Sequence, residues 1–542
     1  MNRLINRTKD FVFAQQTSIL SSTLILSGMI ILSRIAGFFR FRILAGYYTK
    51  EELDVLFAAF RLPDLVFEIL ITGALSTTFI PFFIKFAQNE EEQSRVISSI
   101  INIISLILLG AVIILTLFLP YLIPILTPGF SPEKSRLVVY FSQILLLGQL
   151  PFLVLGNFLT GISQAKKSFL IPAIVPVLYN LSAIVSTVLF NQKLHLMAPL
   201  WGFVFGSIIF FVLQLPVLYF ANFKYRLIIN HVRETYQFFR TAVPRVFTVV
   251  VSQIDATIDL TLATLLGSGS YTVLYLAQRL QLLPVSIIGV AFGQASLPYL
   301  SEIYQKKKLP ELQKIIEDSI LNMLYLVVPV ASFFIFARTP IVRLFFGGEK
   351  FDWEATVTTA ITLSAFSCSL PFHSIYYFLT RCFYAVFDTK TPFYISLFSV
   401  SLNSILSIVM IVFLKWPVWS MAASFSLSIT LNVSLLLIML YKKIGGYNIR
   451  HLFWETTKIA VATFNASVIA YFMLRVFDGL IFDTTRTINV FLLLVFCGTV
   501  YLGLYMFLTW VFGIQEMYFI TKMVLKVRGQ KQKTTEVFQG VE

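Results

Sequence analysis

The sequence predicts an all-α polytopic membrane protein with about fourteen transmembrane helices. Apolar runs of about 20 residues, the length that crosses a bilayer as a helix, recur along the whole chain. The 542 residues are 57% hydrophobic and only 13% charged, with a mean hydropathy of +0.81. Short segments of alternating hydrophobicity, which a transmembrane β-barrel needs, are absent from the sequence. No stretch between the predicted helices is long enough for a soluble domain, so the function must reside in the membrane region.

The predicted helices fall into three groups. The first six cover about 17–47, 54–86, 94–126, 135–165, 169–190 and 197–221. The next six cover about 235–265, 271–303, 314–346, 357–387, 391–414 and 417–441. The last two cover about 453–477 and 486–513. The domains expected from them are a cytoplasmic N-terminal segment at 1–16, an N-lobe at 17–221, a basic linker at 222–234, a C-lobe at 235–441, a C-terminal helix pair at 442–513 and a basic cytoplasmic tail at 514–542.

The positive charges behind the net charge of +15 are distributed along the chain as is typical of membrane proteins. Lys and Arg gather in alternate loops, with examples at Lys166 and Lys167, at Lys306 to Lys308, and at Lys442 and Lys443. This is the positive-inside pattern, and it predicts that both termini are cytoplasmic. Basic loops at that surface would contact anionic lipid headgroups, so membrane lipids and not nucleic acid are the expected partners.

The sequence offers little for enzyme chemistry. Cys368, Cys382 and Cys497 all fall in apolar segments, where cysteine packs as a small apolar residue, and the four histidines have no metal-ligand spacing. A nucleotide-binding loop is also missing. We therefore expect a protein that is not an enzyme and has no cofactor, driven by a sodium or other ion gradient, by the membrane potential or by the gradient of its own substrate.

Two halves of the chain are similar. Pro151-Phe152 and Phe158-Leu159-Thr160 recur as Pro371-Phe372 and Phe378-Leu379-Thr380, and Ala59-Phe60-Arg61-Leu62 has a counterpart in Ala277-Gln278-Arg279-Leu280. With six helices in each half, both copies have the same orientation, so the repeat is parallel about a pseudo-two-fold axis along the membrane normal. Such folds place the substrate path between the halves and rock one half against the other.

Arginines occupy the first two apolar segments. Arg34, Arg40, Arg42 and Arg61 lie inside or at the edges of these segments, although a guanidinium at the bilayer centre costs roughly 3 kcal/mol. Such a group favours a water-filled cavity that receives an anion, and the alternative is that the side chains reach headgroups or pair with Asp54, Asp64 and Glu68. Arg61 and Arg279 occupy equivalent places in the repeat, where they would hold a pyrophosphate between the lobes.

Two further pairs suggest an ion site. Asp255 and Asp259 are four residues apart in the predicted helix 235–265 and therefore share a face. They are either a proton or cation site or partners of an arginine such as Arg279. Asn403 and Ser407 have the same spacing and would offer neutral oxygens to a small cation, unless Asn403 bonds to a neighbouring helix.

Several strings resemble the MviN/MurJ lipid II flippases of the multidrug/oligosaccharidyl-lipid/polysaccharide exporter (MOP) superfamily. They are SRIAGFFR at 33–40, DVLFAAFRLPDL at 54–65, GALSTTFIP at 73–81, SQIDATID at 252–259, LAQRLQLLPVSIIGVA at 276–291 and DTKTP at 388–392. The resemblance implies two lobes around a cationic cavity, with the last two helices forming a groove for a polyprenyl tail. It also implies that the chain flips an undecaprenyl-pyrophosphate-linked peptidoglycan precursor to the outer leaflet of the bacterial cytoplasmic membrane, by alternating access, for the cell-wall synthesis machinery.

The resemblance also implies residue roles. Arg34, Arg40 and Arg279 correspond to family arginines, Asp54 to the acidic position of its motif, Asp259 to a sodium-site aspartate and Asn403, more weakly, to a sodium ligand. The chain departs from the family at Phe67 and Glu68, where an Arg pair is usual, and at Thr72 and Phe41, where acids are usual. Arg42 is extra. We therefore predict Asp54, Glu68, Arg42 and Asp255 as gating residues or charge partners.

Other functions fit parts of the pattern. The departures leave open the export of another polyprenyl-linked glycan, whereas a drug exporter would favour an acidic cavity over an arginine-rich one. A different class, a transport-inactive membrane scaffold for envelope assembly, would tolerate neutralisation of every arginine in the cavity.

Overall fold

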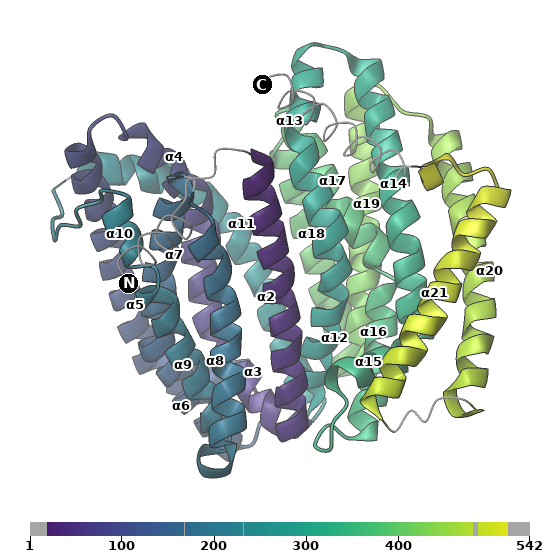
Figure 1. Cartoon of the computed structure of the whole chain (residues 1–542), viewed down its shortest axis with the longest axis horizontal. Coiled ribbons are helices and arrows are strands. Elements are labelled where there is room, and N and C mark those ends of the chain that lie inside the picture. Colours follow the sequence, from purple (N-terminus) through teal and green to yellow (C-terminus); the bar gives the residue numbers. More distant parts are fainter. Residues whose placement is uncertain (1–18, 167, 231, 481–485, 519–542) are drawn as a thin grey trace, which may run out of the picture. The chain divides into compact units, whose positions relative to one another are not determined.

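The computed structural model describes residues 19–166, 168–230, 232–480 and 486–518, and it is helical with no strand among them (Figure 1). The predicted segment 1–16, Lys167 and most of the tail predicted at 514–542 lie outside the described residues. The chain forms two compact units. One comprises Met1–Val273 and Phe345–Ala355, and the other comprises Leu274–Leu344 and Thr356–Glu542.

Most helices of the first half belong to the first unit. They are α2 (Ile19–Tyr47), α3 (Lys50–Phe67), α4 (Ser76–Lys85), α5 (Glu90–Leu126), α6 (Pro132–Ile144), α7 (Leu150–Ala165), α8 (Leu170–Leu194), α9 (Met197–Val212), α10 (Pro216–Phe220) and α11 (Val232–Leu265). Two π-helical segments, η1 (Glu68–Leu75) and η2 (Leu145–Gln149), interrupt them. The helix predicted at 235–265 thus packs with the first unit as α11.

The remaining helices build the second unit, except where α12 and the 345–355 segment cross the boundary. They are α12 (Ser270–Pro284), η3 (Val285–Val290), α13 (Ala291–Gln305), α14 (Leu309–Phe336), α15 (Arg338–Phe346), α16 (Trp353–Ser367), α17 (Leu370–Ala385), α18 (Lys390–Ile408), η4 (Val409–Phe413), α19 (Trp419–Ile444), α20 (Ile449–Leu480), α21 (Thr487–Val511) and η5 (Gln515–Met517).

Each predicted apolar segment coincides with one helix or with consecutive helices. In the described residues, ten helices are long and apolar enough to cross a membrane, or eleven if α16 and α17, bent by 45°, form one span. The all-helical, multi-pass fold is therefore confirmed. The count of fourteen crossings, the lobe boundaries and the symmetry between lobes stay predictions.

The helix breaks follow the repeat. The π-helical segment η1 begins at Glu68, seven residues after Arg61, and η3 begins at Val285, six residues after Arg279. Likewise η2 lies just before Pro151, and the α16–α17 bend lies just before Pro371. Proline lacks the amide hydrogen and crowds the preceding turn, so it distorts a helix locally. Breaks at matching positions in both halves support the duplication that the motifs suggested.

Two tyrosines connect the last long helix, α21, to α14. On α21, Tyr501 donates its hydroxyl hydrogen to the carbonyl of Pro329 at 3.0 Å, and Tyr505 donates to the carbonyl of Tyr325 at 2.9 Å. Both rings are buried, and both acceptors belong to α14. Because buried hydroxyl groups need partners, these bonds fix α21 in register on α14.

The DTKTP string forms the start of α18. The Asp388 carboxylate accepts hydrogen bonds from the Thr391 amide at 3.0 Å and from the Thr391 hydroxyl at 2.7 Å, and it pairs with Lys443 of α19. Desolvation opposes ionisation, but the bonds from Lys443 and Thr391 outweigh it and lower the pKa of Asp388 to about 2. The carboxylate therefore stays charged at physiological pH and holds the α17–α18 turn to α19.

Candidate functional site

Arg61 is held by α11 within the first unit. Its Nε donates to the Thr257 hydroxyl at 3.0 Å, and its Nη2 donates to the same hydroxyl at 2.9 Å and to Gln253 Oε1 at 2.8 Å. Nη2 also donates to the Gln253 carbonyl. The half-buried guanidinium thus joins α3 to α11, because its planar donors match three oxygens of that helix.

Two carboxylates lie on α11 beside the residues that bind Arg61. Asp255 and Asp259 are both half-buried, and Asp259 interacts electrostatically with Asp255 and with Arg61. The structure therefore brings Arg61 and the acidic pair of the sequence analysis into one cluster. Asp259 thus has both an acid and a guanidinium within electrostatic range, which fits either alternative of the sequence analysis, an ion site or the partner of an arginine.

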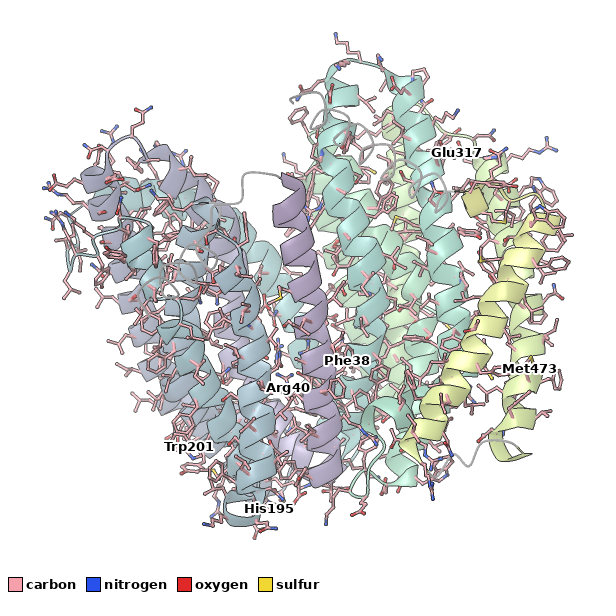
Figure 2. All side chains as sticks on the ribbon, in the orientation of Figure 1. Phe38, Arg40, His195, Trp201, Glu317 and Met473 are labelled. Atoms are coloured by element: carbon pink, nitrogen blue, oxygen red, sulfur yellow. The ribbon has the colours of Figure 1, made fainter. Side chains whose placement is uncertain are left out.

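The arginines of α2 lie in different surroundings. Arg34 is exposed, whereas Arg40 and Arg42 are half-buried. The Arg40 guanidinium, labelled in Figure 2, lies 4.6 Å from the ring centroid of Phe41 and 5.1 Å from that of Phe203 on α9. Aromatic faces stabilise a cation in apolar surroundings without neutralising it. The Arg40 guanidinium of α2 therefore contacts an aromatic ring of α9 within the first unit.

Asp54 caps a helix. Its fully buried carboxylate accepts a hydrogen bond from the Thr272 amide at 2.7 Å and another from the Gly269 amide at 2.5 Å. These amides belong to the first turn of α12 and to the residue before it, and such groups have no acceptor inside the helix. The Thr272 hydroxyl in turn donates to the Lys50 carbonyl at 2.8 Å. Asp54 therefore connects α3 to the start of α12, a role that the sequence assigned only as gating or charge pairing.

The second unit carries its own basic residues. Arg279 on α12 donates from Nη2 to the Tyr275 hydroxyl at 2.7 Å, and its guanidinium lies 4.6 Å from the centroid of that ring. Arg381 on α17, which we did not predict, is half-buried and lies 5.5 Å from the ring centroid of Tyr384. The signal that identified Arg61, an arginine inside an apolar segment, also marks Arg381 in the predicted helix 357–387.

The remaining predicted residues are placed as follows. Glu68 is half-buried where α3 passes into η1. Asn403 is buried, and its Oδ1 accepts a hydrogen bond from the Ser424 hydroxyl of α19 at 2.9 Å, the interhelical contact that the sequence analysis left open. Among the described residues, no group of three His, Cys, Asp or Glu side chains is arranged to hold a metal. Asp259 and Asn403 belong to different units, as do Arg61 and Arg279, so both pairings stay predictions.

The fold defines the class of protein. A solved multidrug resistance MATE family transporter of the MOP superfamily, in an inward-facing conformation, superposes with a TM-score of 0.64 at 14% identity. The match covers 76% of this chain and 94% of that one. At this identity the likeness shows the fold alone. The chain is thus a multi-pass membrane protein with the MOP-superfamily fold that carries arginines on its apolar helices.

Within that class, the chain belongs to the lipid II flippase MurJ family, whose model matches residues 48–492. The probable lipid II flippase MurJ of Rickettsia prowazekii is 28% identical over 403 residues, which cover 73% of this chain and 78% of that protein. The Buchnera aphidicola (subsp. Acyrthosiphon pisum) protein of the same name is 26% identical over 519 residues, covering 93% and 99%. A solved lipid II flippase MurJ in an inward closed conformation is 27% identical with a TM-score of 0.74, covering 90% and 99%. The family resemblance is confirmed.

Proposed function

We propose that the chain moves lipid II, the polyprenyl-pyrophosphate-linked peptidoglycan precursor, from the inner to the outer leaflet of a bacterial cytoplasmic membrane. The observation that carries this proposal is the family match across residues 48–492. The retained positive charges on α2 and α12 support it, because a diphosphate needs cationic donors when it leaves water. The chain acts as a transporter and not as an enzyme, both termini lie in the cytoplasm, and the cell-wall synthesis machinery uses the product.

The arginines divide into two roles in this proposal. Arg34, Arg40 and Arg279 contact the pyrophosphate, since a guanidinium presents paired donors that match phosphate oxygens. Arg61 is a positioning residue, because its donors already bind Gln253 and Thr257. Arg381 joins the substrate-binding group as a basic side chain of the second unit.

The membrane potential is the proposed driving force. An inside-negative potential favours outward movement of an anion by about 2.3 kcal/mol for each elementary charge per 100 mV. Sodium held at Asp259, with Asn403 as a further ligand, is a second candidate for coupling. The proximity of Asp255 to Asp259 favours sodium, because neighbouring carboxylates attract a cation.

A reconstituted flipping assay tests the function. Fluorescent lipid II is placed in liposomes with the purified chain, and arrival of its headgroup at the outer surface is followed. Arg34→Ala and Arg279→Ala should each slow flipping by at least about tenfold, because a hydrogen bond to a charged group contributes about 1.5–3 kcal/mol. Arg95→Ala is the matched control, since Arg95 is an exposed arginine whose side chain pairs with Glu91.

The outcomes separate the alternatives. Wild-type rates in both Arg34→Ala and Arg279→Ala contradict the arginine mechanism. Rescue of cells depleted of their own lipid II flippase distinguishes lipid II from another polyprenyl-linked glycan. A transport-inactive scaffold would not rescue such cells, and its own cellular role would survive neutralisation of every arginine in the cavity. Exchanging sodium for potassium, or setting the potential to zero, identifies the driving force in the same liposomes.

A further inference from the structure

His373 of α17 is an ionisable side chain within an apolar span of the second unit. It is half-buried, and its neighbours are Gln281 of α12, Tyr377 of its own helix and Phe425 of α19. Among the described residues, no charged side chain lies against it. An ionisable group is costly to keep in a membrane span and usually serves a function there.

The imidazole of His373 accepts a hydrogen bond from a buried amide. The Gln281 Nε2 atom lies 3.0 Å from His373 Nδ1 and 3.1 Å from Ser369 Oγ. The nitrogen of a side-chain amide is a donor only, so Nδ1 carries no hydrogen and the imidazole is neutral, with its hydrogen on Nε2. The structure therefore shows the uncharged form of His373.

The same surroundings suit the charged form. The Gln281 Oε1 atom is buried and has no hydrogen-bond partner among the described residues. Rotating the amide by about 180° brings Oε1 to the position of Nε2, where it accepts from a protonated Nδ1 and from the Ser369 hydroxyl. The ring centroids of Tyr377 and Phe425 lie 5.5 and 5.3 Å from that of His373, and aromatic rings stabilise a cation. Gln281 can therefore bind either form of His373.

His373 continues a line of side chains that begins at Arg381. Tyr377 stacks on His373 with ring planes inclined by 21°, and it interacts electrostatically with Arg381. The three residues are half-buried and four positions apart, so they follow one side of α17. Arg381 lies about 12 Å closer to the α17–α18 turn, at 1.5 Å per residue. Because Lys390 predicts that this turn is cytoplasmic, His373 is the deeper of the two basic residues.

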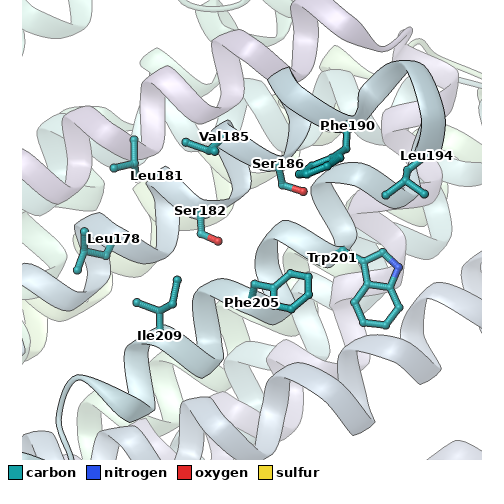
Figure 3. Close-up of a pocket in the computed structure, with 10 residues that line it drawn as sticks. All are labelled: Leu178, Leu181, Ser182, Val185, Ser186, Phe190, Leu194, Trp201, Phe205 and Ile209. Carbon is teal, nitrogen blue, oxygen red and sulfur yellow. The ribbon is translucent and has the colours of Figure 1, made fainter.

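The apolar groove between α8 and α9 of the first unit, about 510 Å³ in volume, offers an anion no such position (Figure 3). Ser182 and Ser186 are the two hydroxyl-bearing residues of its lining. They donate to the carbonyls of Gly202 and Ala198 at 2.9 and 2.6 Å, so both hydroxyl hydrogens are already used. A surface of this kind suits membrane hydrocarbon, whereas the line on α17 can gain positive charge.

We propose that His373 is a proton-switched binding residue for the pyrophosphate of the lipid-linked substrate. This inference rests on the proposed function. When the pyrophosphate moves inward from Arg381, Nδ1 takes up a proton from water, because a nearby anion favours the charged imidazolium, and Nε2–H donates to a phosphate oxygen. The proton returns to water when the pyrophosphate departs. A guanidinium at that depth would retain the anion, whereas histidine changes its charge near neutral pH.

The pH dependence of substrate binding tests the switch. Fluorescent lipid II is titrated into the full chain in nanodiscs of phosphatidylcholine, which has no net charge, between about pH 8 and pH 6, where an imidazole titrates. The pyrophosphate of lipid II is a diester and does not titrate in this range. We expect the affinity of the wild type to rise by at least about fivefold as the pH falls, because proton and anion favour each other's binding.

Two histidine variants locate the effect. His373→Gln keeps a polar side chain that takes up no proton near neutral pH, and it should lose the increase in affinity. His451→Gln is the matched control, because His451 is an exposed histidine that pairs with Glu317, and it should keep the increase. Asp255 and Asp259 are present in all three proteins, so their titration contributes equally. The same pH dependence in the wild type and in His373→Gln overturns the proposal.

Proton uptake by the wild type is a test that needs no variant to fold. Lipid II added to the weakly buffered protein at about pH 7 should raise the pH that an indicator dye reports, because the imidazole binds protons from water. Phosphatidylglycerol added in its place should not. Absence of uptake with lipid II would mean that His373 stays neutral, and equal uptake with phosphatidylglycerol would mean that any anionic lipid charges it. Either result overturns the proposal.

Flipping of labelled lipid II by the same wild-type preparation, reconstituted in liposomes, separates this test from that of the proposed function. Flipping together with binding that does not depend on pH overturns the switch alone. Proton uptake on binding without flipping leaves the switch standing and overturns the flippase function.

Discussion

At the scale of the residue, the Thr257 hydroxyl is the acceptor that fixes Arg61. It accepts from both Nε and Nη2 of the guanidinium and donates to the Gln253 carbonyl of its own helix. A hydroxyl can play both parts because it carries one donor and two acceptor lone pairs. Together with the two oxygens of Gln253, this threonine therefore determines where the charge of α3 lies relative to the carboxylates of α11.

Thr257→Val keeps the shape of the side chain and removes both acceptor interactions. We expect the free energy of unfolding to fall by about 1 kcal/mol, in the upper range measured for hydrogen bonds between membrane helices. Thermal unfolding in detergent measures this. Thr261→Val is the matched control on the same helix, because the Thr261 hydroxyl donates only to the Thr257 carbonyl. Equal destabilisation by the two variants would show that Thr257 does not hold Arg61.

At the scale of the element, the start of α12 depends on a carboxylate supplied by α3. Asp54→Ala leaves the Gly269 and Thr272 amides without an acceptor in a fully buried position, and we expect a loss of about 1–3 kcal/mol in unfolding free energy. Asp54→Asn keeps one acceptor oxygen and should lose less. The same unfolding measurement applies, with Glu51→Ala one turn earlier as control. Asp54→Ala as stable as wild type would rule out the cap.

The elements themselves were predictable to different degrees. Apolar runs located every α-helix, because length and hydropathy alone determine what can cross a bilayer. Interruptions such as η1 and η3 were not predicted, although Pro63 and Pro284 lie near them, since a proline can also be accommodated within a continuous helix, as Pro329 is in α14. The two amides that bind Asp54 could not be predicted either, because a backbone amide leaves no signal in the sequence.

The partners of single residues depend on how distant segments meet. Sequence spacing placed Asp255 and Asp259 on one face of a helix, and the structure adds Arg61 from a helix about 190 residues earlier. By contrast, spacing left two alternatives for Asn403, a cation or a neighbouring helix, and its contact with Ser424 is of the second kind, the commoner one for Asn in membrane helices. Arg40 over Phe203 could not be foreseen, because aromatic residues are so frequent in this chain that none stands out as its partner.

At the scale of the whole molecule, the charge of the loops predicts the orientation in the membrane. Lys193 and Lys307 are exposed residues next to the ends of α8 and α13. Lys193 belongs to a loop poor in basic residues, whereas Lys307 lies between Lys306 and Lys308. Because basic loops resist translocation, Lys307 should face the cytoplasm and Lys193 the outside.

Cysteine labelling checks this orientation. Cys368 is exposed, while Cys382 and Cys497 are buried, so Cys368→Ser alone provides a background of low reactivity. In intact cells, an impermeant maleimide should label Lys193→Cys and leave Lys307→Cys unlabelled, and both should react after permeabilisation. The opposite pattern would mean that the chain has the inverse orientation. Equal labelling of both before permeabilisation would place both loops on one side of the membrane, which the odd number of crossings predicted between them, at 197–221, 235–265 and 271–303, does not allow. The result identifies which helix ends face the cytoplasm, whereas an inside-negative potential drives an anion outward whatever the orientation of the chain.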